Sequence, residues 1–156
     1  MSGIIVIFVC GCAGCLIGVF FYKKYKERSA YFTDVVGLIE TLVVDVRYRQ
    51  DGLLMVLNNY KVGLKSDFSS TIESFLNGNI GEQKISVLNK IERKRVEKFF
   101  ASLGRIDSDT QLLLLQGEKE EFTKLSTLAK EKFVKYGSMF IKLGFLLGIG
   151  IGILLI

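Results

Sequence analysis

Three cysteines, Cys10, Cys12 and Cys15, lie close together near the start of the chain. Thiols at such short spacing can ligate zinc or form a redox pair when they face water. Here they fall inside nineteen residues without charge, Ile4 to Tyr22, where a thiol packs as a small apolar group. The "CAGC" segment resembles a lipoprotein cleavage box, but no basic residue precedes the apolar run and the run continues past it. We interpret the cysteines as structural, with a cleaved signal peptide as the alternative.

Other side chains that commonly perform catalysis are missing or scattered. The sequence has no histidine, which excludes Ser-His-Asp and Cys-His catalysis and histidine-ligated metal sites. The carboxylates Glu118, Glu120 and Glu121 suit surface ion pairs, and the charged run from Glu92 to Lys98 suits a solvated helix face, with an acidic partner as the alternative. We expect a protein that is not an enzyme, with no catalytic residues, cofactor, metal or small-molecule substrate.

Glycines recur at four-residue spacing in both apolar ends of the chain. The segment "GIGIG" superficially resembles a dinucleotide-binding loop, but it lies within an apolar run that no strand precedes. A row of glycines instead clears one face of a helix, so that another backbone can approach closely in lipid. We predict that the rows pack membrane helices, and the alternative is that glycine is simply frequent in such helices. The rows are Gly14 and Gly18, and Gly144, Gly148 and Gly152.

The segments that carry these glycines have the length of a bilayer. Met139 to Ile156 contains one charge, Lys142, in eighteen residues, and as a helix it would span roughly 27 Å. Ile4 to Tyr22 matches it at the other end of the chain. Roughly 115 residues remain between them, enough for one modest core. The predicted organisation is a transmembrane helix at 4–22, one helical domain at 23–138 and a second transmembrane helix at 139–156.

The charges predict how the chain crosses the membrane. All 21 lysine and arginine residues and all 16 acidic residues lie between Lys23 and Lys142. Because basic residues flank both apolar segments on the inner side, the positive-inside rule places the domain in the cytosol and both termini outside it. A basic collar at anionic lipid accounts for the net charge of +5 without nucleic acid. The predicted membrane-interface residues are Lys23, Lys24, Lys26, Arg28 and Lys142, the last reaching back toward the headgroups.

The pattern of apolar residues predicts an all-α fold, because no alternating strand pattern occurs. We expect the first and last helices to be long and to run antiparallel out of the membrane, packed along their apolar faces. In the last helix this face is expected to contain Leu115, Phe122, Leu125, Ala129, Tyr136, Met139 and Leu143. Three shorter helices are expected, from Gly52 to Val62, from Phe68 to Asn77 and from Gly81 to Leu103. Asp51 and Asp67 are expected to cap the starts of the first two, and Asp107 the start of the last long helix. Gly63, Gly78 and Gly104 are expected to end the three shorter helices.

The third of these shorter helices is expected to bury one side and expose the other. The side facing the core is predicted to carry Ile85, Leu88, Ile91, Val96, Phe99 and Leu103. The charged segment Glu92 to Arg95 is expected largely on the opposite side.

Two stretches and the layout of the chain resemble one family. The stretches are "LGRIDSDTQ" from Leu103 to Gln111 and "KYGSMFIKLGFLLGIGIGILLI" from Lys135 to Ile156. The chain also has one apolar segment at each end and a helical domain between them. With these features it resembles stage III sporulation protein AB over nearly its whole length, and "IETLVVDVRY" resembles the family more loosely. The chain departs from the family where "RQDGLL" lacks the usual proline. The most specific matches are Leu103, Gly104, Asp107 and Gln111, with Leu143, Gly144 and Gly148.

This resemblance implies a role in endospore formation. The family is part of a sporulation complex in the mother-cell membrane that surrounds the forespore. Its soluble domain is similar to the F-type platform domain of type II secretion machines, which implies a cytosolic secretion-type ATPase as a partner, beside other membrane subunits of the sporulation channel. We therefore expect a non-enzymatic membrane platform. The alternative is a membrane-tethered adaptor that binds a soluble regulator and has no channel role.

Overall fold

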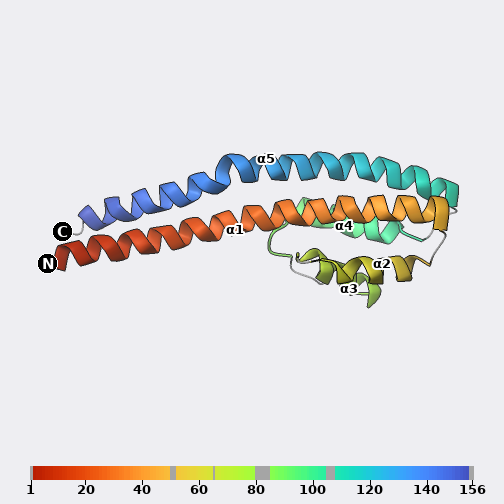
Figure 1. Ribbon diagram of the computed structural model, residues 1–156, viewed down its shortest axis with the longest axis horizontal. Coiled ribbons are helices and arrows are strands. Elements are labelled where there is room, and N and C mark those ends of the chain that lie inside the picture. Colours follow the sequence, from red (N-terminus) through yellow and green to blue (C-terminus); the bar gives the residue numbers. More distant parts are fainter. Residues whose placement is uncertain (1, 50–51, 65, 80–84, 105–107, 155–156) are drawn as a thin grey trace. The chain divides into compact units, whose positions relative to one another are not determined.

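The computed structural model describes residues 2–49, 52–64, 66–79, 85–104 and 108–154, and over these residues it is helical with no strand (Figure 1). The prediction of an all-α fold is confirmed. The chain divides into a terminal unit, Met1–Lys26 with Leu128–Ile156, and a middle unit, Glu27–Thr127. The elements are α1 (Ser2–Val44), the π-helical turn η1 (Asp45–Arg49), α2 (Leu53–Val62), α3 (Phe68–Leu76), α4 (Lys90–Ser102) and α5 (Ser108–Leu154).

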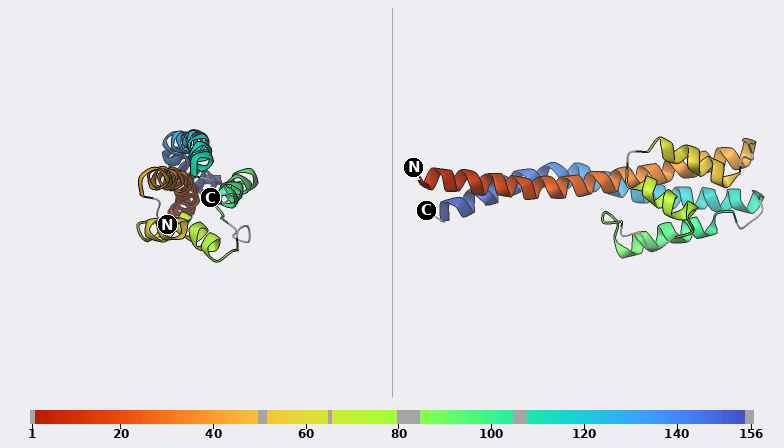
Figure 2. Two further views of the ribbon diagram at one scale, coloured as in Figure 1. Left: turned by 90° about the vertical axis from the view of Figure 1, so that its right-hand side faces the viewer. Right: turned by 90° about the horizontal axis from the view of Figure 1, so that it is seen from below.

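The terminal unit consists of the beginning of α1 packed along the end of α5, as both figures of the whole chain show (Figures 1 and 2). Gly14 lies against Gly144, whereas Ile7, nearer the start of α1, lies against Gly152, nearer the end of α5. The two helices therefore run antiparallel, as expected. Aromatic rings extend the contact in the pairs Phe21–Phe140 at 5.3 Å, Tyr25–Phe140 at 5.7 Å and Tyr22–Phe133 at 5.3 Å between ring centres.

The middle unit is a bundle in which α2, α3 and α4 pack against the remaining parts of α1 and α5. These parts of α1 and α5 also run antiparallel, because Glu40 pairs with Lys119 at 2.9 Å while Thr33 meets Ser126 at 3.4 Å. Aromatic side chains make up much of the core. The largest fully buried ones are Tyr31, Phe32, Phe68, Phe99, Phe100 and Phe122. Ring contacts at 5.2 Å (Tyr31–Phe68) and 5.6 Å (Phe99–Phe122) join α1 to α3 and α4 to α5.

Three glycines follow helices where the sequence predicted that helices would end. Gly63 follows α2 with an ordinary helical φ of −83°. Gly78 and Gly104 have φ values of 76° and 72°, a left-handed conformation that costs other residues strain because Cβ approaches the carbonyl oxygen. The expected caps Asp51 and Asp107 lie outside the described residues. Asp67 precedes α3 as expected, but its side chain makes no capping hydrogen bond.

The expected helix from Gly81 to Leu103 is wrong over residues 85–89. Residues 85–89 are not helical, and α4 begins at Lys90; residues 80–84 lie outside the described part. The start is fixed by Asn89, whose side chain accepts a hydrogen bond from the Glu92 backbone N–H at 2.9 Å, while Glu92 accepts one from the Asn89 N–H at 3.0 Å. Such a reciprocal capping box satisfies two backbone donors that a helix start would otherwise leave free.

The predicted faces of this helix also need correction. Glu92 is buried, with 6% of its surface exposed, whereas Ile91 is 80% exposed. The remaining expected core residues, Ile85, Leu88, Val96, Phe99 and Leu103, are buried. Glu92 can occupy the inner side because its carboxylate pairs with the Arg28 guanidinium from α1, and a paired, hydrogen-bonded charge tolerates burial.

Candidate functional site

The five glycines singled out in the sequence all lie where α1 and α5 meet in the terminal unit. A methyl group built on Gly18 would stand 2.6 Å from the Phe140 carbonyl oxygen, and one on Gly152 would stand 2.8 Å from the Ile7 Cα. On Gly14, Gly144 or Gly148 it would lie still closer to a backbone carbonyl oxygen of the facing helix. Real Cβ atoms essentially never approach other atoms within 3.0 Å. The two backbones are therefore in direct contact, and no side chain fits between them.

Two further glycines belong to this contact and were missed in the sequence. Gly11 and Gly137 are buried, and methyl groups on them would meet Ile149 at 3.6 Å and the Tyr22 ring at 3.2 Å. Each stands seven residues before a glycine of the predicted rows, which places it on the same helix face. Gly150 is different, because it is exposed and a methyl group there would meet nothing within 4 Å.

The outer surface of the same unit is formed by large apolar side chains. They include Phe8, Leu16, Phe20, Leu146, Leu147 and Leu154, which are between 63% and 87% exposed. Both helices contain a stretch long and apolar enough to cross a membrane, and only 11% and 17% of the two stretches are buried within the structure. The core helix of a water-soluble protein would be mostly buried, so this exposure fits a membrane localisation.

The basic residues assigned to the membrane interface fall into two settings. Lys23, Lys24 and Lys26 of α1 and Lys142 of α5 are exposed on the terminal unit. Arg28 belongs to the middle unit, where it pairs with the buried Glu92 and lies 5.8 Å from the centre of the Phe32 ring. Only the lysines are therefore disposed toward solvent or lipid headgroups, and the interface role of all five stays a prediction.

The residues of the family motif surround the end of α4 and the start of α5. Leu103 is buried at the end of α4, and Gly104 follows in the left-handed conformation. A methyl group on Gly104 would also stand 3.1 Å from the Leu53 side chain. Gln111 is half-buried in the first turns of α5, and Asp107 lies outside the described residues. The described part of the motif therefore covers the end of α4 and the first turns of α5.

Charged residues of α5 join it to α4. Arg95 of α4 pairs with Glu118 at 3.7 Å and with Glu121, and its guanidinium lies 5.8 Å from the centre of the Phe122 ring. Glu118 and Glu121 were expected only to make surface ion pairs, so their partner on α4 is a finding of the structure. No group of three or more acidic or cysteine side chains placed to hold a metal occurs in the described ranges.

Comparison with known proteins gives the family. The family model of stage III sporulation protein AB matches residues 1–156, and the chain therefore belongs to this sporulation family. No curated protein and no solved structure matched the chain.

Proposed function

We propose that this member of the stage III sporulation protein AB family is a non-enzymatic membrane platform of the sporulation channel complex between mother cell and forespore. The terminal unit would anchor the protein in the mother-cell membrane. The middle unit would lie in the cytosol and couple a secretion-type ATPase to other membrane subunits. The observation that supports this proposal best is the glycine contact between α1 and α5, with large apolar side chains on its outer surface.

Small residues inside and large apolar side chains outside are the reverse of the core of a water-soluble protein. In lipid, apolar burial cannot hold two helices together, because lipid tails are as apolar as leucine. Small residues between the helices and large ones outside are what membrane helices use instead, since close backbones gain dispersion contacts that lipid cannot replace. The middle unit shows the opposite arrangement, with large aromatic and aliphatic side chains in its core and, apart from the buried pair Arg28–Glu92, its ion pairs at or near the surface.

The topology can be tested with reporters. A reporter that works only outside the cytoplasm should be active when fused after Ile156 and inactive when inserted at Gly63, an exposed position after α2. The same fusions with a reporter that works only in the cytoplasm should give the reverse pattern. Activity outside the cytoplasm at Gly63 would contradict the cytosolic middle unit, and the ATPase partner with it.

The platform role can be tested by purification from sporulating cells. We expect the full-length protein to bring down the ATPase and membrane subunits of the channel complex after mild detergent extraction. A matched pair of variants, Gly148→Leu and Gly150→Leu, adds the same side chain to one contact position and one open position. Loss of the subunits with Gly148→Leu alone would support the platform. Recovery of a single soluble protein from every variant would contradict the platform and favour the adaptor.

A further inference from the structure

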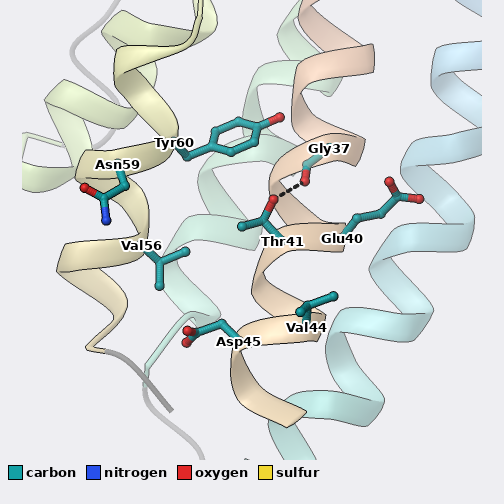
Figure 3. A pocket seen from close by; sticks show the side chains of 8 residues that line it. All are labelled: Gly37, Glu40, Thr41, Val44, Asp45, Val56, Asn59 and Tyr60. Carbon is teal, nitrogen blue, oxygen red and sulfur yellow. Dashed lines mark hydrogen bonds between the residues drawn. The ribbon is translucent and has the colours of Figure 1, made fainter. Parts of the chain in front are cut away.

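The middle unit contains a pocket of about 530 Å³ between α1 and α2 (Figure 3). Its size falls within the roughly 300–1,000 Å³ typical of ligand pockets. The wall from α1 and η1 consists of Gly37, Glu40, Thr41, Val44 and Asp45, and the wall from α2 consists of Val56, Asn59 and Tyr60. All eight residues belong to one unit, and the pocket has no role in the membrane contact.

Asp45 is the unusual residue of this pocket. It opens the π-helical turn η1, only 6% of its surface is exposed, and its Oδ1 atom has no hydrogen-bond partner among the described residues. Figure 3 shows its carboxylate directed into the space between α1 and α2, near Val56. A buried carboxylate oxygen without a partner destabilises a fold, because it loses water and gains nothing in return. Such π-helical turns occur frequently at functional sites.

The surroundings of Asp45 are also negative. Glu40 lines the same pocket, and the Tyr60 hydroxyl donates a hydrogen bond to the Asp34 backbone carbonyl at 2.9 Å. Burial, together with the nearby charges of Asp34 and Glu40, raises the pKa of Tyr60 to about 12. Glu40 pairs with Lys119 of α5 at 2.9 Å. The lining of the pocket thus contains two acidic side chains, Glu40 and Asp45, and no basic one.

We propose that this pocket receives the guanidinium group of an arginine side chain from a partner protein. A guanidinium is planar and weakly hydrated, donates hydrogen bonds to a carboxylate and stacks on aromatic rings. Asp45 supplies the carboxylate, and Val44 and Val56 supply an apolar path for the aliphatic stem. A lysine ammonium, which is compact and strongly hydrated, is a poorer partner for a buried carboxylate between apolar walls.

The same unit already binds its own arginines in this way. Arg28 combines the buried Glu92 carboxylate with the Phe32 ring, and Arg95 combines Glu121 with the Phe122 ring. The pocket at Asp45 offers a third buried or partly buried acid, and among the described residues no group donates a hydrogen bond to its Oδ1 atom. The inference rests on the proposed function only in requiring a cytosolic partner. It adds the chemistry by which the middle unit would bind that partner.

The pocket can be tested on the full-length protein in detergent micelles with N-acetyl-L-argininamide as the probe. Nuclear magnetic resonance should show shifts of the Thr41 and Asn59 backbone amides, with a dissociation constant on the order of 1 mM for so small a ligand. N-acetyl-L-citrullinamide has nearly the same shape without the charge, and it should bind at least about tenfold more weakly. Equal binding of the two probes, or no shift with either, would overturn the proposal. Equal binding of N-acetyl-L-lysinamide would overturn the preference for arginine.

Two variants with the same chemical change locate the site. Asp45→Asn removes the buried charge and should weaken binding of the arginine probe at least about tenfold. Asp67→Asn makes the identical change at an exposed residue outside the pocket and should leave binding unchanged. Unchanged binding with Asp45→Asn would refute the site. If a variant is poorly folded, the comparison of the arginine and citrulline probes on the unaltered protein still tests the proposal.

A crosslinking arm connects the pocket to a partner. A photoreactive amino acid at Val44, which is 51% exposed at the pocket, should crosslink in sporulating cells to a partner peptide that contains arginine. Replacing that arginine by glutamine should lower the crosslinking yield at least about tenfold. Unchanged yield would refute the arginine contact. Probe binding without recovery of channel subunits would contradict the proposed platform and keep the pocket, whereas the reverse result would contradict only the pocket.

Discussion

Gly148→Leu is the substitution for which the structure gives the sharpest expectation. Gly148 is buried where α5 meets α1, and a methyl group there would clash with the Cys10 carbonyl oxygen and stand 2.9 Å from the Gly11 Cα. Both obstacles are backbone atoms, which cannot rotate away as a side chain can. Leucine is more apolar than glycine, so insertion into the membrane should be unaffected.

The size of the effect follows from the distances. Ordinary contacts of a Cβ atom lie between 3.4 and 4 Å, so the helices must separate by roughly 1 Å or more at this point. A gap of about 0.5–1 Å already forfeits a quarter to a half of the dispersion attraction between facing atoms. Overpacking of a well-packed contact typically costs about 1–3 kcal/mol. The free energy that holds α1 against α5 should fall by that amount, a change of about 5- to 150-fold in the population of the separated state.

The native thiol of Cys10 reports this separation. Cys10 is half-buried and lies against Gly148 and Gly152 in the contact, so an uncharged maleimide should reach it faster when the helices part. With Cys12 and Cys15 replaced by serine, the labelling rate of full-length protein in micelles should rise severalfold for Gly148→Leu, and by at most about 150-fold. Unfolding of the whole protein is monitored in parallel by circular dichroism, because the middle unit should keep its helices.

Gly150→Leu is the matched control. Its methyl position meets nothing within 4 Å and points away from α1, since two residues along a helix turn the side chain by about 200°. We expect its labelling rate to stay within about twofold of the unaltered protein. Equal rates for both variants would show that the glycine row does not hold the helices together, and the reasoning from backbone contact would fail.

Three further predictions concern the middle unit and are measured by melting the full-length protein in detergent. Glu92→Ala removes a buried ion pair and half of a capping box, and it should lower the unfolding free energy by about 3 kcal/mol or more, whereas Lys94→Ala on the exposed side should change it by less than about 0.5 kcal/mol. Gly104→Val should lower the unfolding free energy by about 1 kcal/mol or more because φ of Gly104 is 72°. Gly117→Ala, near the start of α5 where a methyl group meets nothing within 4 Å, should raise the unfolding free energy by about 0.5–1 kcal/mol. Folding raises the pKa of Tyr60 from 10.0 to about 12. As the pH rises, the Tyr60 hydroxyl therefore loses its proton in the unfolded chain before it does so in the folded protein, and the unfolding free energy falls between pH 10 and pH 12. Tyr60→Phe should make this fall smaller.

Each of these results has an outcome that would contradict it. Glu92→Ala melting like the unaltered protein would show that the ion pair with Arg28 contributes nothing. Gly104→Val without effect would mean that the turn relaxes into a conformation open to any residue. An unchanged alkaline fall in Tyr60→Phe would assign that fall to other groups, of which the buried Tyr31, whose pKa burial also raises, is the first candidate.

The boundaries of helices were predictable wherever a glycine had to take an unusual conformation. Gly78 and Gly104 are visible in the sequence as stops, and the structure gives both a positive φ. The start of α4 was not found, because apolar spacing from Ile85 onward continues a helical period although residues 85–89 are not helical. The signal that could have located it is local: Asn89 followed three residues later by Glu92 is a capping-box sequence.

The buried carboxylates were beyond the reach of sequence patterns. Glu92 lies in a charged segment and was expected on the solvated side of its helix, and nothing in the sequence singled out Asp45, yet both are 6% exposed. What permits burial of Glu92 is Arg28, a residue 64 positions away. Long-range pairs of this kind depend on the packing of α1 against α4, and periodicity within one helix carries no information about them.

One apolar face was predicted to continue along the whole of the last helix, and the reason it does not is physical. Leu115, Phe122 and Ala129 are buried as expected, but Met139 and Leu143 are 40% and 43% exposed. In water, large apolar side chains turn toward the partner helix, because burial removes them from solvent. In lipid that gain disappears, and the helix instead turns its glycines inward and its large side chains outward. The face therefore changes along α5 from leucine and phenylalanine to Gly137, Gly144, Gly148 and Gly152. Under the proposed function, that change of residue type, more than hydrophobicity alone, separates the membrane contact from the core of the middle unit.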